Sequence, residues 1–109
     1  MIRLIQGGLR VNDCQYAMFI HRGKEYNKIN KVMVEKHVNF IRDLDNKGML
    51  AYCGAFKGYP GVAGMIVMKT GSFEEADALC KTEPFVAEGY ATYKLYEIRQ
   101  GTMENNYLL

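Results

Sequence analysis

The stretch MVEKHVNFIRDLDNKGMLAYCGAF, residues 33–56, predicts a helix, its end and a strand in direct succession. Apolar residues recur at intervals of three and four on one face of a helix that we expect from about residue 30 to residue 47: Ile29, Met33, Phe40, Ile41 and Leu44. Gly48 ends this helix, because glycine adopts the left-handed conformation that closes a helix without steric cost. The aromatic and apolar segment 49–56 that follows is typical of a strand.

Three more segments predict strands. Residues 14–21 and 62–70 are apolar on both faces, and residues 91–99 form the last strand. Between the last two of these segments, Ser72 and Glu75 have the spacing of a capping box, which starts a second helix. The chain therefore alternates strands and helices over most of its length.

The order strand, helix, strand, strand, helix, strand predicts a ferredoxin-like α+β fold with a four-stranded antiparallel sheet and both helices on one face. Pro84 ends the second helix near Thr82, because a proline disfavours helical torsions in the residue before it. We expect one domain over residues 14–100. Residues 1–13 then form an arm or an extra strand, and residues 101–109 form a tail that is either disordered or docked by its last apolar residues.

The two strands that are apolar on both sides also predict how the sheet is covered. A sheet of this kind buries both faces, and the two helices cover only one of them. We expect a second copy of the chain to cover the other face, which makes the protein a homodimer. The alternative is that the N-terminal arm or the C-terminal tail covers it.

Composition excludes several classes of partner. The chain has 109 residues and a formal net charge of +2, too small to indicate binding to nucleic acid or to an anionic membrane. The third predicted strand, VAGMIVMK, lacks the aromatic residues with which ferredoxin-like domains bind RNA. No apolar run approaches the roughly 20 residues that span a bilayer.

The cysteines and histidines favour neither a metal nor a cofactor. Cys14, Cys53 and Cys80 form no Cys-x-x-Cys pair, and there are only two histidines, His21 and His37. Each cysteine lies among apolar residues, so we expect buried, reduced thiols in a cytoplasmic protein.

His37 occupies the apolar face of the first helix, where a leucine would serve packing equally well. Imidazole gains or loses a proton near neutral pH, so this residue is a candidate general acid or base. The alternative is a core histidine that makes one backbone hydrogen bond, since a helix position facing a sheet usually serves packing.

From His37 onward the chain resembles the YciI-like (YCII-related) family. The resemblance rests on His37, on Gly48 and, in this order, on the segments MLAYCGAF, GYPG, SFEEADALC and EPFVAEGYATYKLYEI. It implies a dimeric ferredoxin-like α+β barrel. It also implies an active site made of His37 and the acidic residue before Pro84, which is Glu83 here and usually aspartate in the family. From the sequence pattern alone, Glu83 is equally well an exposed loop acid near a helix end.

We therefore expect His37 and Glu83 to be catalytic and Tyr52, Gly54 and Phe56 to contact a small-molecule substrate. The function these residues favour is acid/base chemistry of the isomerase or lyase type on a small organic molecule. The alternative is a non-catalytic dimer that binds a small molecule and uses His37 structurally. A cofactor-free oxygenase of the related dimeric barrel type is a third interpretation, which no haem-ligand or flavin motif supports.

Overall fold

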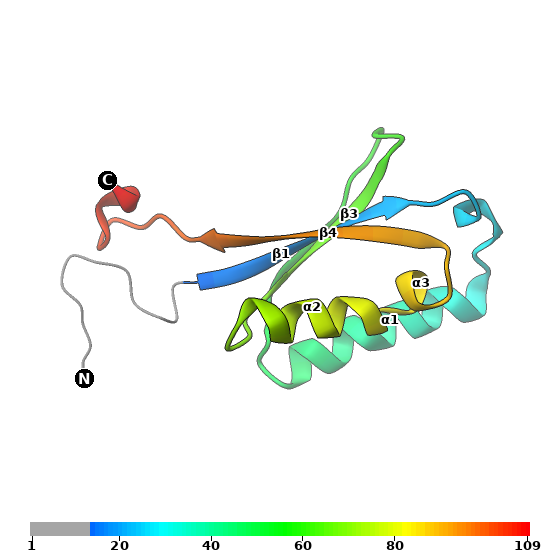
Figure 1. Cartoon of the computed structure of the whole chain (residues 1–109), viewed down its shortest axis with the longest axis horizontal. Helices are drawn as coiled ribbons and strands as arrows, with labels where there is room; N and C mark the ends of the chain where they lie inside the picture. The colour runs from blue at the N-terminus through cyan, green and yellow to red at the C-terminus, as the bar shows by residue number, and fades with distance from the viewer. Residues whose placement is uncertain (1–13) are drawn as a thin grey trace.

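A computed structural model describes residues 14–109 of the chain, and the predicted N-terminal arm lies outside this range (Figure 1). The strands are β1 (Cys14–Arg22), β2 (Leu50–Ala55), β3 (Val62–Met68) and β4 (Ala91–Arg99). The α-helices are α1 (Lys31–Asn46), α2 (Phe73–Thr82) and α3 (Pro84–Ala87), and two short 3-10 turns are η2 (Tyr26–Lys28) and η3 (Asn106–Leu108). The predicted ferredoxin-like α+β fold is confirmed, with one additional short helix.

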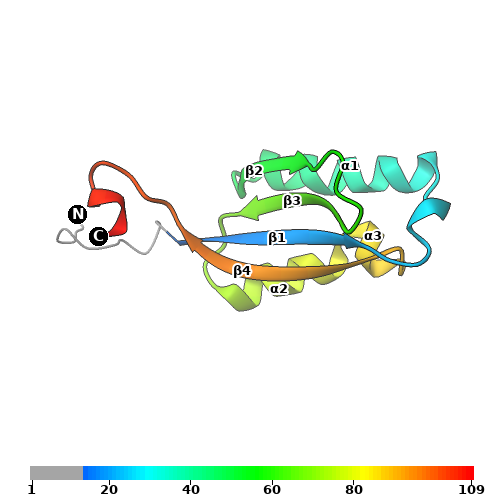
Figure 2. The ribbon, with the colours of Figure 1, turned by 90° about the horizontal axis from the view of Figure 1, so that it is seen from above.

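The four strands form one antiparallel sheet in the order β2-β3-β1-β4. Figure 2 shows the sheet from its open side, with α1 behind the β2 and β3 half and α2 behind the half that contains β4. All three α-helices lie on the same face (Figure 1). Strands β2 and β4 are therefore the two edges, and α1 lies along the β2 edge.

The core lies between the sheet and the helices. Alternate residues of β1 point toward the helices and are almost fully buried, which follows from the period of two in a strand. Residues of both layers form this core, namely Tyr16, Met18, Ile20, Ile66 and Met68 from the sheet and Met33, Leu44, Ala76 and Cys80 from the helices. The apolar series on α1 thus packs as its periodicity predicts, with His37 on the same side.

Local signals explain where each helix begins. The Asn30 side chain caps α1 by accepting a hydrogen bond from the backbone N–H of Met33 at 3.0 Å. The Ser72 hydroxyl accepts the N–H of Glu75 at 3.1 Å, so the predicted cap of α2 is confirmed. Gly48 follows α1 with a positive φ of 73°, as a helix-ending glycine should.

Helix α3 was not expected from the sequence. Pro84 ends α2, as predicted, but it also occupies the first turn of a new four-residue helix, where its missing N–H costs nothing. Glu83 is the N-cap of that helix, and its side chain accepts the N–H of Val86. The segment after Pro84 is therefore ordered and turns back toward the core instead of forming a simple connection.

The second face of the sheet carries a group of aromatic side chains that we call the aromatic face: Phe19, Tyr52, Phe56, Tyr59 and Tyr96. The Phe19 ring stacks on Phe56 with ring centroids 6.3 Å apart and meets Tyr96 edge-on at 5.9 Å. No helix of the described residues covers this face (Figures 1 and 2). Tyr52, Tyr59 and Tyr96 are more than half exposed in the single chain.

The C-terminal tail extends away from the helices and the sheet (Figure 1). It forms its own turn, in which the Asn105 amide donates to the Gln100 carbonyl at 2.8 Å. Tyr107, Leu108 and Leu109 are exposed, so they do not dock on the core. Among the described residues, no helix is long and apolar enough to cross a membrane.

Gly64 on β3 is expected to be intolerant of any side chain. A Cβ atom at this position would lie 2.7 Å from the Gly54 carbonyl oxygen of β2, and both groups are backbone. We expect Gly64→Ala to lower the free energy of unfolding by about 1–3 kcal/mol, the usual cost of overpacking. Gly61→Ala is the matched control, because a Cβ at Gly61 meets no atom within 4 Å. Urea unfolding of both variants checks this, and equal stabilities would contradict it.

Candidate functional site

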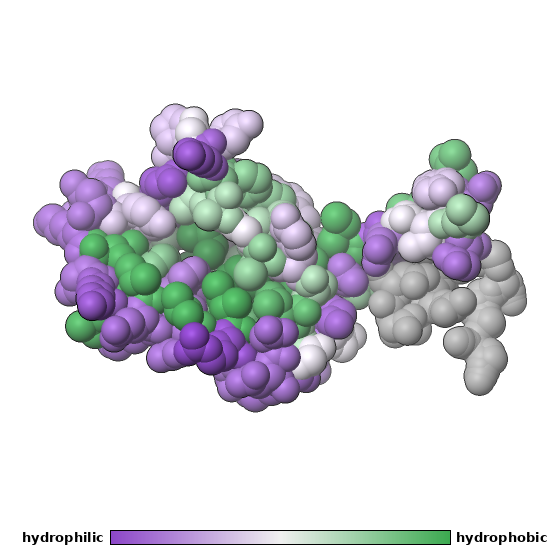
Figure 3. Space-filling view, turned by 180° about the vertical axis from the view of Figure 1, so that it is seen from behind, coloured by the Kyte–Doolittle hydropathy of each residue, from purple (hydrophilic) through white to green (hydrophobic). Residues whose placement is uncertain are grey.

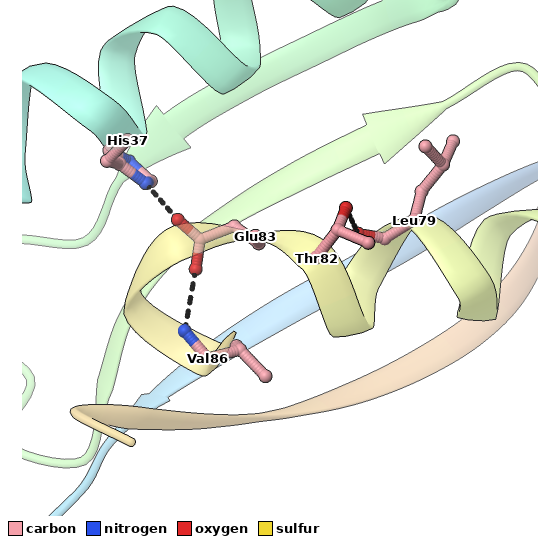
Figure 4. Close-up of polar contacts among 5 residues, drawn as sticks. All are labelled: His37, Leu79, Thr82, Glu83 and Val86. Atoms are coloured by element: carbon pink, nitrogen blue, oxygen red, sulfur yellow. Dashed lines mark hydrogen bonds and ion pairs between the residues drawn. The ribbon is translucent and has the colours of Figure 1, made fainter. Parts of the chain in front are cut away.

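His37 and Glu83 are joined by a hydrogen bond, although 46 positions separate them. His37 lies on α1, and Glu83 lies at the junction of α2 and α3 (Figure 4). The distance from His37 Nδ1 to Glu83 Oε2 is 2.6 Å, which is short for a nitrogen–oxygen hydrogen bond and typical of a charge-assisted one. The structure thus brings the two expected catalytic residues together.

Glu83 is completely buried, so it is not the exposed loop acid that its position at a helix end allowed. Its two oxygens have separate partners: Oε2 accepts from His37, and Oε1 accepts from the Val86 backbone N–H at 3.1 Å (Figure 4). A buried carboxylate is stable only when hydrogen bonds compensate for its lost hydration. The start of α3 supplies one of these bonds and α1 supplies the other, so the fold itself fixes the position of this carboxylate.

A carboxylate accepts but does not donate hydrogen bonds, so we assign the ring proton of neutral His37 to Nδ1. The other nitrogen, Nε2, then carries a lone pair. The ring plane is held by Phe85, whose ring stacks on the imidazole with centroids 4.3 Å apart and an interplanar angle of 6°. Phe85 in turn meets Tyr26 edge-on at 5.9 Å. The hydrogen bond and the stacking together determine the direction in which Nε2 points.

The imidazole forms part of the wall of a pocket of about 440 Å³ between α1 and the strands β2 and β3. Helix α1 contributes four residues to it, namely Val34, His37, Val38 and Ile41. Figure 3 shows that hydrophobic residues gather where α1 faces this side of the sheet. The side chain of His37 is 21 % exposed, so a molecule in the pocket has access to it.

The sheet side of the pocket combines small and large residues. The small ones come from the neighbouring strands β2 and β3 and are Cys53, Gly54, Ala55, Ala63 and Gly64, and the large ones are Ile20, Met65 and Ile66. Tyr26 and Phe85, whose rings meet edge-on, also line the pocket. Part of the floor is therefore backbone and methyl groups, whereas α1 contributes branched side chains.

Of the three expected substrate contacts, the structure places Gly54 at the pocket and Tyr52 and Phe56 away from it. Tyr52 pairs with Val67 and belongs to the aromatic face. Side chains two positions apart in a strand point to the same side, so Tyr52 and Phe56 share a face. The residues of β2 whose side chains alternate toward the helices are Cys53 and Ala55, and these line the pocket.

Three residues beside His37 were missed in the sequence: Phe85, Tyr26 and Cys53. The only local signal for Phe85 is its place in the first turn of a helix that begins with Pro84. Tyr26 belongs to the one-turn helix η2, whose length produces no periodicity. Cys53 was expected to be buried, but it is exposed because β2 is an edge strand.

A second polar cluster joins α2 to β4. The Tyr93 hydroxyl donates to the Asp77 carboxylate, and Lys81 forms an ion pair with the same carboxylate at 3.3 Å. The hydrogen bond from Tyr93 lowers the pKa of Asp77, and the same bond together with desolvation raises the pKa of Tyr93 to about 12. None of these residues lines the pocket, so their role is to hold α2 against the sheet.

Arg22 binds backbone carbonyls. Its guanidinium donates to the carbonyl of Tyr59, in the β2–β3 connection, at 2.6 Å and to that of Val62, at the start of β3, at 3.1 Å. It also lies over the Tyr26 ring, 5.3 Å from the centroid. Arg22 therefore holds the connection against the pocket end instead of serving as an anion site.

The three thiols are expected to differ in reactivity. Burial raises the pKa of Cys80 to about 12, so at pH 8 only roughly one thiol in ten thousand is the reactive thiolate. Cys53 is exposed at the pocket, whereas Cys14 is half-buried and its pKa is raised by burial. We expect iodoacetamide at pH 8 to modify Cys53 first and Cys80 last, as followed by peptide mass spectrometry. Modification of Cys80 as fast as Cys53 would contradict this.

Within residues 14–109, no three side chains of histidine, cysteine, aspartate or glutamate are arranged so that they could hold a metal ion. The His37–Glu83 pair supplies one nitrogen and one carboxylate, and that carboxylate is already occupied by two hydrogen bonds. The chemistry available at this site is therefore that of a proton donor and acceptor beside an apolar pocket.

The fold is similar to that of several solved structures. One is 5-chloro-2-hydroxyhydroquinone dehydrochlorinase from Burkholderia phenoliruptrix AC1100 in complex with 2,5-dihydroxybenzoquinone, with a TM-score of 0.67 and 13% identity over 80% of this chain and 95% of that chain. Another is a conserved protein of unknown function from Bacteroides thetaiotaomicron VPI-5482, described as a possible oxidoreductase, with a TM-score of 0.49 and 14% identity over 79% of this chain and 95% of that chain.

A search of the curated proteins found no match. The sequence profile of the YCII-related domain, in contrast, matches residues 14–100, which include all four strands and all three α-helices. The chain therefore belongs to the YCII-related domain family.

Proposed function

We propose that this protein catalyses proton transfer on a small organic molecule, an isomerisation or an elimination, with His37 as the acid/base catalyst. The observation that carries the proposal is the 2.6 Å contact between His37 Nδ1 and the buried carboxylate of Glu83 at the wall of a pocket. Titratable groups paired in this way beside a pocket are typical of catalytic sites. The structurally similar dehydrochlorinase is an enzyme that was solved with a small ring compound. At 13% identity, this supports small-molecule chemistry only by analogy.

In the proposed reaction, the Nε2 lone pair of His37 takes a proton from a carbon or oxygen atom of the bound molecule. The Nδ1–H bond to Glu83 orients the ring, and the carboxylate stabilises the imidazolium that forms. The proton then returns to a different atom of the same molecule, which gives an isomer, or a leaving group departs, which gives an alkene or a quinone-like product. Gly54 lies at the pocket floor, where its backbone can contact the substrate.

The test is a conversion assay in D₂O. A library of small metabolites is incubated with the wild type and with His37→Asn, and each compound is followed by mass spectrometry. We expect at least one compound to gain deuterium or to lose a small leaving group with the wild type only. If compounds bind but none is converted, the protein is the non-catalytic binder in which His37 is structural. If the variant converts the same compounds equally fast, the conversion does not depend on His37 and the proposed role of His37 is contradicted.

We also propose that two copies of the chain associate through the aromatic face. This face carries five aromatic side chains, it is not covered by any helix of the described residues, and Tyr96 on it is 53% exposed. Burial of such a patch against an identical one is a common basis for a twofold dimer. All three cysteines are unpaired, which fits a reducing compartment such as the cytoplasm.

Light scattering coupled to size exclusion tests the dimer. We expect a molar mass of twice the 12.4 kDa of one chain. Tyr96→Glu is expected to reduce the mass to that of a monomer, because it places a charge in the interface. Tyr107→Glu is the matched control, since Tyr107 is 60% exposed on the tail, away from the sheet. A monomeric wild type would contradict the proposal.

A further inference from the structure

The pocket beside His37 has an unusual electrostatic character for a site that holds an acid/base pair. Among the described residues that line it, none is an aspartate, glutamate, lysine or arginine. His37 is held from behind by Glu83, whose carboxylate is completely buried and already accepts two hydrogen bonds. The guanidinium of Arg22 is engaged with the backbone carbonyls of Tyr59 and Val62. Arg42 lines a neighbouring pocket that shares Val34 and Val38, and its guanidinium donates to the Asn39 side chain at 2.9 Å. The residues that line the pocket beside His37 thus offer no cation to an anionic ligand.

One part of the pocket floor carries no large side chain. It lies on the adjacent strands β2 and β3, where Gly54 and Gly64 bear no side chain and Ala55 and Ala63 bear only methyl groups, and Ile20, Met65 and Ile66 complete the sheet side. Gly64 also cannot acquire a side chain, because the Gly54 carbonyl oxygen occupies that space. On the opposite side, α1 presents Val34, Val38 and Ile41. A flat molecule contacts such a floor over its whole face, whereas a puckered one touches it at a few atoms only.

The volume limits the size of the occupant. A cavity of about 150 Å³ in a protein core is enough for a benzene molecule. The volume of about 440 Å³ here is therefore enough for one or two fused rings. The stacked rings of His37 and Phe85, at a centroid distance of 4.3 Å, both line the pocket and combine a polar imidazole with an apolar phenyl ring.

We propose that the substrate is an uncharged, planar molecule of one or two rings that presents a hydroxyl or carbonyl oxygen to Nε2 of His37. The proposal rests on the proposed function, since it names the substrate class of the same site. It excludes carboxylates and phosphates, because an anion that enters this pocket loses its hydration without gaining a cation or a set of hydrogen-bond donors. The oxygen of the ligand meets Nε2 of His37.

Binding of three matched probes tests the substrate class, with NMR titration of the wild-type protein at pH 7. The probes are 2-naphthol, decahydro-2-naphthol and 6-hydroxy-2-naphthoate, which have the same hydroxyl and differ in planarity or in charge. We expect 2-naphthol to shift resonances of the pocket residues and to bind at least tenfold more tightly than each of the other two. Equal or tighter binding of the naphthoate would overturn the proposal, and so would equal binding of the puckered alcohol.

Val38→Lys adds a cation to the pocket wall and gives a second, independent test. Val38 is 41% exposed on α1, so a lysine at this position keeps its ammonium group in water and does not disturb the core. We expect the ratio of naphthoate to naphthol affinity to rise at least tenfold in Val38→Lys and to remain unchanged in Val38→Leu. An unchanged ratio in the lysine variant would show that the anion is not excluded by the missing charge.

These measurements separate the substrate class from the proposed chemistry. Binding requires no turnover, so tight binding of 2-naphthol without any conversion in the D₂O assay would uphold the substrate class and contradict the proposed function. If His37 is needed for the conversion of an anionic compound, the proposed function is upheld and the substrate class is contradicted.

Discussion

Glu83→Gln is expected to lower the rate of proton transfer by His37 by about 10²- to 10⁴-fold. The carboxylate of Glu83 accepts two hydrogen bonds on two different oxygens, one from the Val86 N–H at 3.1 Å and one from His37 Nδ1 at 2.6 Å. A glutamine has one accepting oxygen and one donating NH₂ group. When its oxygen caps α3 at Val86, its NH₂ group faces Nδ1, and the ring proton must move to Nε2. Nε2, the proposed base, then no longer accepts a proton.

The measurement is the rate of deuterium gain or leaving-group loss for the compound that the D₂O assay identifies. Glu88→Gln is the matched control, because Glu88 is half exposed and only forms a 3.9 Å ion pair with Lys36. Its rate should equal that of the wild type. Glu83→Asp keeps the charge but shortens the side chain by one methylene, so we expect an intermediate rate. A Glu83→Gln rate within a factor of two of the wild type would contradict the proposed role of Glu83.

Phe85→Ala is expected to lower the free energy of unfolding by about 3–5 kcal/mol, the usual cost of emptying a buried phenylalanine site. Phe85 is 6% exposed, and its ring packs between the His37 imidazole at 4.3 Å and the Tyr26 ring at 5.9 Å. The substitution removes both aromatic contacts and leaves a cavity beside the His37 ring. Chemical denaturation at a fixed protein concentration measures the loss, because dimerisation makes the stability depend on concentration.

Phe73→Ala is the control for Phe85→Ala, because it removes the same side chain from a more exposed position. Phe73 is 40% exposed at the start of α2 and meets Tyr16 edge-on at 6.2 Å, so its loss should cost about 1 kcal/mol or less. Phe85→Leu retains most of the buried volume but not the stacking, and we expect it to lose less than about 1.5 kcal/mol. A Phe85→Ala protein within about 1 kcal/mol of the wild type would show that the ring is not part of the core.

The sequence predicted best those elements that have a long periodic series of apolar residues or a local capping residue. Helix α1 has an apolar series across four turns and ends at Gly48, and its observed range differs from the expected one by a single residue at each end. The start of α2 was predictable because the Ser72 cap acts within three residues. The strands were predictable from their apolar segments, and their pairing was predictable from the order of the elements along the chain.

The features that the sequence did not reveal depend on distances between segments. Pro84 indicates a helix end and a helix start equally well. The sequence therefore could not show whether a simple connection or the helix α3, with a buried Phe85, follows it. Tyr52 and Phe56 were assigned to the substrate by their motif, whereas strand alternation directs them to the other face of the sheet.

The pairing of His37 with Glu83 was suggested by the family resemblance, and its 2.6 Å distance became visible only in three dimensions. The family resemblance implies aspartate at this position, and this chain has glutamate. One oxygen of Glu83 caps α3 while the other reaches across to α1.

The tautomer of His37 is the property on which the proposed chemistry depends most directly. Nitrogen-15 NMR distinguishes a protonated ring nitrogen from an unprotonated one, and at a pH where the ring is neutral it can be applied to both ring nitrogens of His37, with His21 as the internal reference. We predict a proton on Nδ1 and a free Nε2 in the wild type, and the opposite arrangement in Glu83→Gln. A wild-type ring protonated on Nε2, or the same tautomer in both proteins, would contradict the role of Glu83 and with it the acid/base function of the site.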